Sequence, residues 1–165
     1  MFESEPLGED HDLSQFDSGQ PALDEWLRRH ARQADAKRQG RTYIWHAEGD
    51  PGVVAYFTLC PHVLERAELP RRLGRGDPDR IPSLLLARLA LDRKLHGQGL
   101  GTELLPDALG RALAASNRVG GRYLTVDAID EQAAAFYEQC GFHACPGAGV
   151  HRLVRKVSDI AATLG

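Results

Sequence analysis

The chain has 165 residues, of which 42% are hydrophobic and 26% are charged, and its formal net charge at pH 7 is −3. These are the values of an ordinary globular protein, and we expect one domain spanning residues 1–165. The first residues lack a basic region followed by an apolar one, and no apolar run approaches membrane length. The sequence therefore argues against a signal peptide and a membrane span, and it predicts a cytoplasmic location.

Residues 6–20 predict a short edge strand and a turn, followed by a helix over residues 21–39. In that helix, apolar side chains recur at intervals of three and four residues. Asp17 and Ser18 are candidate N-terminal caps, and Gly40 ends the helix.

Residues 41–47 and 53–59 are rich in β-branched and aromatic side chains and are separated by turn-forming residues, which predicts a β-hairpin. Residues 61–82 are basic and broken by proline and glycine. We expect them to form a connecting loop with a short helical piece, placed where it could contact a substrate.

An apolar central strand is predicted over residues 81–91, and a helix over residues 98–116. Pro106 lies inside that helix, where a proline removes one backbone hydrogen bond, so we expect a kink or an irregular turn. The sequence suggests no function for this proline.

Residues 122–127 and 149–157 predict two further strands, and residues 130–139 a helix that ends at Gly141. Because strands alternate with helices around one central apolar strand, the fold class is α/β with a mixed central sheet flanked by helices.

Charge is distributed unevenly along the chain. The first 25 residues are strongly acidic, and two basic clusters follow. These clusters comprise Arg28, Arg29, Arg32, Lys37, Arg38 and Arg41, and then Arg71, Arg72, Arg75, Arg80, Arg88, Arg93 and Lys94. They could steer a polyanion such as a nucleic acid, or they could simply solvate a face of the protein.

The three cysteines, Cys60, Cys140 and Cys145, lack the paired spacing of metal ligands. We therefore expect reduced thiols rather than disulfides or metal ligands. The alternative is that one of them is a catalytic cysteine.

The central strand runs into a turn with glycines at positions 97, 99 and 101, and the next helix begins there. Glycines let the backbone fold tightly, so successive N–H groups can point outward at the positive end of a helix. This pattern predicts a phosphate-binding loop. Thr102 stands where a dinucleotide fingerprint needs glycine, and Thr102-Glu103 stands where a P-loop needs Gly-Lys, so both of those motifs are excluded.

The remaining pattern, His96-Gly97-Gln98-Gly99-Leu100-Gly101, resembles the diphosphate loop of the GNAT acetyltransferases. His96 stands where the family usually has Gln or Arg. A second resemblance lies downstream in Ala133-Ala134-Ala135-Phe136-Tyr137 and Gly141-Phe142, with Asp130 at the usual asparagine position.

The resemblance implies a single-domain GNAT fold in which strands four and five splay apart to admit acetyl-coenzyme A, with no metal. Backbone groups of Leu89, Ala90 and Leu91 would pair with the pantetheine arm. Asp130 would contact the coenzyme, and the diphosphate would be held by the loop residues His96, Gly97, Gln98, Gly99, Leu100, Gly101 and Thr102.

Tyr137 matches the family tyrosine that protonates the leaving thiolate, and a phenol is protonated at neutral pH. The alternative is that Phe136 and Tyr137 are core aromatic residues. Arg88 interrupts an apolar strand, where a charge is costly unless it is paired. Either it forms a salt bridge with a neighbouring carboxylate, or it faces the cleft and binds a phosphate or carboxylate of the acceptor substrate.

Nearly the whole chain resembles the GNAT toxins of bacterial toxin-antitoxin pairs, in Phe16-Asp17-Ser18-Gly19, in Leu23-Asp24-Glu25-Trp26-Leu27, in Arg41-Thr42-Tyr43 and in Arg88-Leu89-Ala90-Leu91-Asp92. This resemblance implies that the substrate is the α-amine of aminoacyl-tRNA, that acetylation stops translation, and that a ribbon-helix-helix antitoxin is the partner.

Two other functions stay open: an acetyltransferase for protein N-termini or small amines, and a coenzyme A-binding module without chemistry. The sequence leaves the identity of the tRNA, the toxin's activity and a homodimer undecided.

Overall fold

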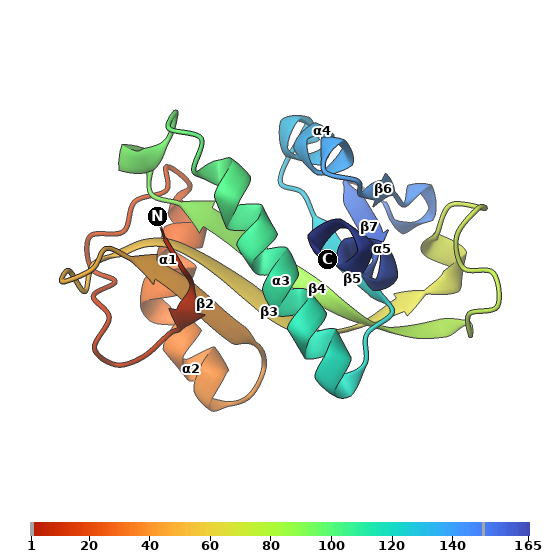
Figure 1. The fold of residues 1–165 in the computed structure, drawn as a ribbon, viewed down its shortest axis with the longest axis horizontal. Coiled ribbons are helices and arrows are strands. Elements are labelled where there is room, and N and C mark those ends of the chain that lie inside the picture. Colours follow the sequence, from red (N-terminus) through yellow and green to blue (C-terminus); the bar gives the residue numbers. More distant parts are fainter. Residues whose placement is uncertain (1, 150) are drawn as a thin grey trace. The chain divides into compact units, whose positions relative to one another are not determined.

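Seven strands form one mixed sheet in the computed structural model, which describes residues 2–149 and 151–165 (Figure 1). In sheet order they are β1 (Glu5–Pro6), β2 (Arg41–His46), β3 (Val53–Glu65), β4 (Arg80–Leu91), β5 (Tyr123–Asp127), β7 (Arg152–Lys156) and β6 (His143–Ala144). The β4–β5 pair is parallel, whereas the β1–β2, β2–β3, β5–β7 and β6–β7 pairs are antiparallel. The prediction of a mixed α/β sheet is confirmed.

Five α-helices accompany the sheet in the described part of the chain: α1 (Pro21–Arg29), α2 (Ala31–Ala36), α3 (Gly101–Val119), α4 (Glu131–Gln139) and α5 (Val157–Leu164). Three short 3₁₀ turns, Arg66–Glu68, Arg93–Leu95 and Pro146–Ala148, lie between the longer elements. None of the described helices has the length and hydropathy that a membrane span requires.

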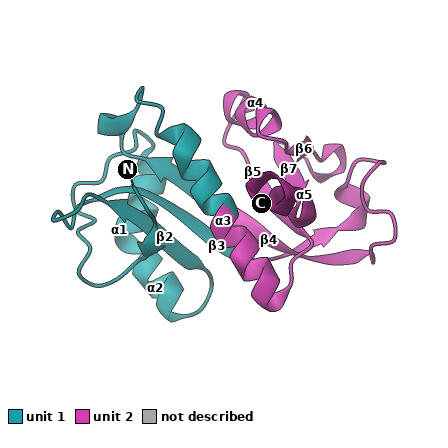
Figure 2. Ribbon diagram, in the orientation of Figure 1, with its two compact units in different colours: residues 1–60, 87–109 teal, residues 61–86, 110–165 magenta. Residues whose placement is uncertain are grey.

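The chain divides into two compact units (Figure 2). Unit 1 comprises residues 1–60 and 87–109, and unit 2 comprises residues 61–86 and 110–165. The strands β3 and β4 and the helix α3 run through both units.

In unit 1, α1, α2 and the segment that precedes α1 pack on β2 and β3. The core contains Phe16, Leu27, Ile44 and Tyr56, each at most 2% exposed. The edge strand β1 pairs only Glu5 and Pro6 with β2. The expected short edge strand is therefore present, but it overlaps the predicted range of residues 6–20 only at Pro6.

In unit 2, β5 and β7 form the centre, and α4 and α5 both contact β7. The core includes Leu64, Ile81, Tyr123 and Val154. The strand predicted over residues 149–157 is observed as β7, and residue 150 lies outside the described residues.

The helix predicted over residues 21–39 is interrupted at His30, whose backbone angles of φ −123° and ψ −22° are not helical. Leu27 and Ala31 are both fully buried in the same core, and the break between α1 and α2 lies between these two residues. The expected cap is also wrong. Gln20 precedes the helix, and Ser18 instead binds Asp24, with its hydroxyl 2.5 Å from Asp24 Oδ1.

The predicted loop over residues 61–82 is shorter than expected, because β3 continues to Glu65 and buries Leu64. The short helical piece is present at Arg66–Glu68. The helix α3 continues through Pro106 without interruption, so of the expected kink or irregular turn the irregular turn is absent. The sequence predicted neither β6 nor α5.

Candidate functional site

The glycine-rich turn connects β4, through the 3₁₀ turn Arg93–Leu95, to the first residue of α3, as expected. Gly97 and Gly99 have positive φ angles of 78° and 76°, which residues with a Cβ atom rarely adopt. The backbone N–H groups of residues 97–101 donate no hydrogen bond to any described residue. A Cβ atom built on Gly97, Gly99 or Gly101 would meet nothing within 4 Å, so the backbone borders open space there.

Side chains of this loop turn back onto its own carbonyl groups. His96 Nε2 donates to the Leu91 carbonyl at 2.9 Å, and Gln98 Nε2 donates to the Lys94 carbonyl at 3.2 Å. The Thr102 hydroxyl donates to the Gly99 carbonyl at 2.5 Å. These contacts use acceptors and leave donors unpaired, so the loop is suited to an anion.

Asp92 fixes the start of the loop, a role that the sequence analysis missed. Its carboxylate is 2% exposed and accepts hydrogen bonds from the backbone N–H groups of Asp17 at 3.1 Å and Lys94 at 3.0 Å. The Arg93 N–H donates to the Asp17 carbonyl at 2.9 Å. An aspartate directly after a buried strand and before a tight turn was the available signal.

The end of β4 carries the three residues predicted to pair with the pantetheine arm. Ala90 is buried, and Leu89 and Leu91 are half-buried. The parallel ladder with β5 covers Ser83–Leu86, and in the described chain β4 continues beyond it to Leu91 without a partner in β5. This register leaves backbone groups unpaired on that side of β4.

Arg88 lies with its guanidinium group 3.7 Å from the centre of the Trp26 ring, a cation–π contact. No carboxylate in residues 2–149 or 151–165 forms an ion pair with it, in contrast to the salt bridge considered above. Burial lowers the pKa of Arg88 below its usual value, although an arginine stays charged at neutral pH.

Arg88 and Trp26 also line a pocket of about 340 Å³ in unit 1, together with His30, Lys37, Thr58 and Cys60. The pocket is open to solvent and has two basic side chains at its wall. It can accept a group that is anionic or aromatic.

Tyr137 lies on α4 in unit 2 and is 9% exposed. Its ring makes edge-on contacts with Phe136 and Phe142, at centroid distances of 5.4 and 5.5 Å. The hydroxyl makes no hydrogen bond to the described residues, in a side chain that is almost fully buried. Burial raises the pKa of Tyr137 to about 12.

Asp130 forms the N-terminal cap of α4, with Oδ1 accepting a hydrogen bond from the Ala133 N–H at 2.8 Å. One oxygen of this side chain is therefore used inside the helix, and only the other is available for a ligand.

The chain resembles known proteins over most of its length. The model of the acetyltransferase (GNAT) domain matches residues 40–144. A Mycobacterium tuberculosis protein named tRNA-acetylating toxin is 36% identical over 154 residues, which cover 93% of this chain and 91% of the relative.

Two solved structures also match this chain over nearly its whole length. AtaT complexed with acetyl-methionyl-tRNA matches with a TM-score of 0.91 and 34% identity, covering 100% of both chains. A tyrosine-to-phenylalanine mutant of AtaT, bound to the C-terminus of the antitoxin AtaR and to acetyl-CoA, matches with a TM-score of 0.83 and 32% identity, covering 99% of this chain and 98% of the other.

Proposed function

This chain belongs to the GNAT acetyltransferase family, and on that premise we propose that it is a toxin that transfers acetyl from acetyl-CoA to the α-amine of aminoacyl-tRNA. The relatives named for tRNA acetylation and for complexes with tRNA and acetyl-CoA support this proposal over the whole length of the chain. The structural observation that carries it is the run of unpaired backbone N–H groups at residues 97–101.

In this proposal the loop from His96 to Thr102 binds the diphosphate of acetyl-CoA. Five successive N–H donors at the N-terminus of the 19-residue helix α3 offer hydrogen bonds and a positive dipole to an anion. The backbone of Leu89, Ala90 and Leu91 pairs with the amide groups of the pantetheine arm, because β4 has unpaired groups beyond Leu86. Asp130 contributes only through its one uncommitted oxygen.

The reaction needs a neutral amine and a proton donor. The amine nitrogen attacks the thioester carbonyl carbon, an N–C bond forms, and the C–S bond breaks. The leaving sulfur takes a proton from the Tyr137 hydroxyl, and the amine releases its proton to water. The Tyr137 phenolate then regains a proton from water, which restores the donor for the next cycle. Since an α-amine has a pKa of about 8, a sizeable neutral fraction exists at pH 7 without a general base.

The proposed role of Tyr137 is supported by its hydroxyl, which has no hydrogen-bond partner among the described residues and is therefore free to donate to a ligand. Its raised pKa keeps the phenol protonated, but it also makes the phenol a weaker acid than free tyrosine. Donation to the sulfur is therefore favoured only as negative charge develops on that atom.

Arg88 is the proposed contact to the acceptor. Its charge has no carboxylate partner in the described chain, and stacking on Trp26 holds the guanidinium plane at the pocket wall. A phosphate or a base of the tRNA acceptor end has the chemistry that this pair binds. Lys37 adds a second positive charge to the same pocket.

The proposed partner is an antitoxin, as in the AtaT–AtaR complex. We further propose that this antitoxin is a ribbon-helix-helix protein and that the toxin acts in the cytoplasm, where charged tRNA occurs. A homodimer is compatible with this function.

The test is acetyl-CoA consumption by the purified protein with charged tRNA, uncharged tRNA, free amino acid or an N-terminal peptide as acceptor. We expect turnover only with charged tRNA. Equal rates with peptide or free amine would instead indicate an acetyltransferase for N-termini or small amines, and tight coenzyme binding without turnover on any acceptor would indicate a binding module.

Tyr137→Phe removes only the hydroxyl and keeps the contacts of the ring with Phe136 and Phe142. We expect kcat to fall by about 100-fold or more while the KM for acetyl-CoA changes little, because general-acid catalysis typically contributes 10²–10⁴-fold. Thermal unfolding of the variant serves as the control for folding. An unchanged kcat would remove Tyr137 from the mechanism.

A further inference from the structure

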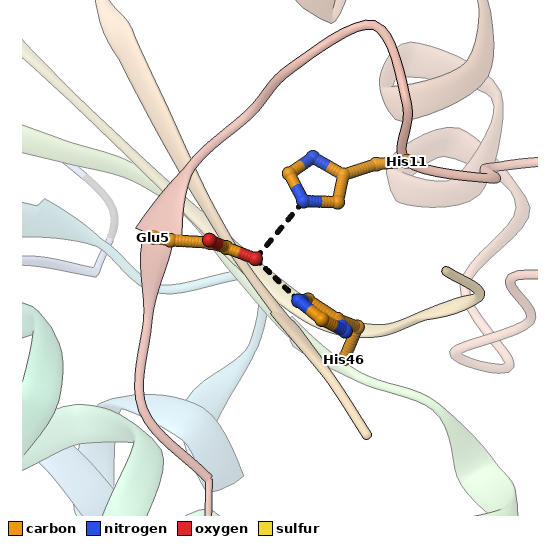
Figure 3. Close-up of side chains that lie close together, drawn as sticks. All are labelled: Glu5, His11 and His46. Carbon is orange, nitrogen blue, oxygen red and sulfur yellow. Dashed lines mark hydrogen bonds and ion pairs between the residues drawn. The ribbon is translucent and has the colours of Figure 1, made fainter. Parts of the chain in front are cut away.

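Glu5 on β1, His11 in the following segment and His46 at the end of β2 form a cluster in unit 1 (Figure 3). One oxygen or nitrogen atom from each side chain lies within 4.8 Å of the others. Nε2 of His11 lies 3.1 Å from Glu5 Oε1, and Nε2 of His46 contacts the same oxygen. No other group of this kind occurs in the described residues, and none of the three takes part in the proposed reaction.

We propose that Glu5, His11 and His46 bind a divalent transition-metal ion such as Zn²⁺. Two imidazoles and one carboxylate are a donor set that zinc takes in proteins. Imidazole donors also favour such ions over Mg²⁺ and Ca²⁺, which prefer oxygen. Ligand atoms about 2.1 Å from a tetrahedral zinc ion lie about 3.4 Å apart, so small side-chain shifts would create the site.

His46 is prepared as a ligand. Its Nδ1 lies 2.8 Å from the Ala47 carbonyl and 3.0 Å from the Asp50 carbonyl, both of which can only accept a hydrogen bond. Nδ1 therefore carries a proton. Because the Glu5 oxygen beside Nε2 also can only accept, Nε2 is protonated as well in the metal-free protein, and a metal ion would take the place of that proton between Nε2 and Glu5. Metal-bound histidines commonly have this arrangement, because the bond from the other nitrogen fixes the tautomer and the ring plane.

His11 is the weaker of the two imidazole ligands. Its Nδ1 accepts a hydrogen bond from the Gly8 N–H at 2.9 Å, so the neutral ring carries its proton on Nε2. For Nε2 of His11 to bind an ion, the proton must move from Nε2 to Nδ1. The Gly8 N–H would then lose its acceptor and donate to a water molecule instead. Gly8 is only half-buried, which permits that exchange.

Exposure and charge both favour entry of a cation. The side chains of His11, His46 and Glu5 are 12%, 29% and 47% exposed, so one side of the cluster is open for an ion and its remaining water ligands. The segment that follows β1 contains the acidic residues Glu9, Asp10 and Asp12, which flank His11 in the sequence. Arg32 opposes them, with its guanidinium bound to the His11 carbonyl at 2.6 Å.

A bound ion would stabilise the edge of the sheet. The strand β1 pairs only two residues with β2, Glu5 with Ile44 and Pro6 with Tyr43. An ion held by all three side chains would tie β1, the segment after it and β2 together. Binding should therefore raise the unfolding temperature.

The test uses tag-free protein titrated with ZnCl₂, with calorimetry for affinity and thermal unfolding for stability. We expect Zn²⁺ to stabilise the wild type. His46→Gln should weaken zinc binding by roughly tenfold or more, and His11→Gln by less. His30→Gln is the matched control, because His30 is an exposed histidine of the same unit outside the cluster, and its affinity should equal that of the wild type.

Equal zinc affinity of the wild type and His46→Gln would overturn the proposal, as would stabilisation by MgCl₂ equal to that by ZnCl₂. If His46→Gln does not fold, Co²⁺ added to the wild type decides the question. Visible absorption that saturates at one equivalent and disappears on adding Zn²⁺ supports the site, and its absence overturns it.

Discussion

The proposed proton donor, Tyr137, combines a hydroxyl that has no hydrogen-bond partner among the described residues with a ring that is packed against two phenylalanines. The family role and core packing, which the sequence posed as alternatives, are therefore compatible in one residue. Burial affects chemistry here through the pKa, which rises to about 12. The phenol is consequently protonated across the whole range in which an amine substrate loses its proton.

This difference in pKa predicts the pH dependence of the reaction. We expect kcat/KM for charged tRNA to rise with pH through about 8, as the α-amine becomes neutral, and then to stay level to about pH 10. Initial rates should be measured, because the aminoacyl ester hydrolyses in base. Tyr137→Phe should react more slowly with the same pH profile. A fall in rate between pH 9 and 10, present in the wild type and absent in Tyr137→Phe, would mean that the phenol ionises with an ordinary pKa of about 10.

Among the elements, the loop before α3 is fixed by hydrogen bonds within its own region and by one to a residue far away in the sequence. His96 and Thr102 bind carbonyls of the loop region, and Asp92 binds the backbone of Asp17 far away in the sequence. The result is a backbone whose N–H groups stay unpaired although its ends are fixed. A preformed site of this kind loses little conformational entropy when an anion binds.

Gly99→Ala tests this loop, because Gly99 has a φ angle of 76° but open space beside it. The added methyl group meets no atom, so the substitution acts on backbone conformation alone, at a cost of about 1–2 kcal/mol. We expect acetyl-CoA binding, measured by calorimetry, to weaken by about fivefold or more.

Gly110→Ala is the matched control. Gly110 lies inside α3, has open space beside it and has no positive φ angle, so the change should stabilise the protein by about 0.5–1 kcal/mol and leave acetyl-CoA affinity unchanged. If the two variants bind the coenzyme equally well, the conformation of the loop does not govern binding.

The elements that could be predicted from sequence are those whose causes are local. The turn at Gly97 and Gly99 follows from glycine's access to positive φ, and the start of α4 follows from a capping aspartate, Asp130. The break at His30 could not be predicted, because the helical periodicity continues across it while Leu27 and Ala31 both pack into the unit 1 core.

The same distinction applies to the site. The proposed roles of Gly97 and Tyr137 rest on motifs that are visible in the sequence, whereas the Asp92 contact joins residues 75 positions apart. The stacking of Arg88 on Trp26 likewise depends on the packing of α1 beside β4. Sequence patterns carry no direct signal of such pairs.

At the scale of the whole molecule, the net charge of −3 would by itself repel a nucleic acid. The two basic clusters counteract this repulsion, although several arginines of the first cluster form hydrogen bonds or ion pairs within the protein. Arg28 binds the Phe16 carbonyl, Arg32 binds the His11 carbonyl, and Arg29 pairs with Glu25. Lys37 and Arg88 instead line the pocket in unit 1. Recognition of tRNA should therefore depend on a few phosphate contacts against an unfavourable overall charge.

This balance predicts a strong salt dependence. Raising salt from 50 to 200 mM should lower kcat/KM for charged tRNA by about tenfold or more, since each neutralised phosphate releases counterions. Arg88→Ala should lower the rate at 50 mM and reduce the slope against salt, whereas Arg118→Ala, an exposed arginine outside both clusters, should keep the wild-type slope. A wild-type rate that does not respond to salt would mean that the acceptor is recognised without phosphate contacts. A slope unchanged in Arg88→Ala would place those contacts away from the Trp26–Arg88 pocket.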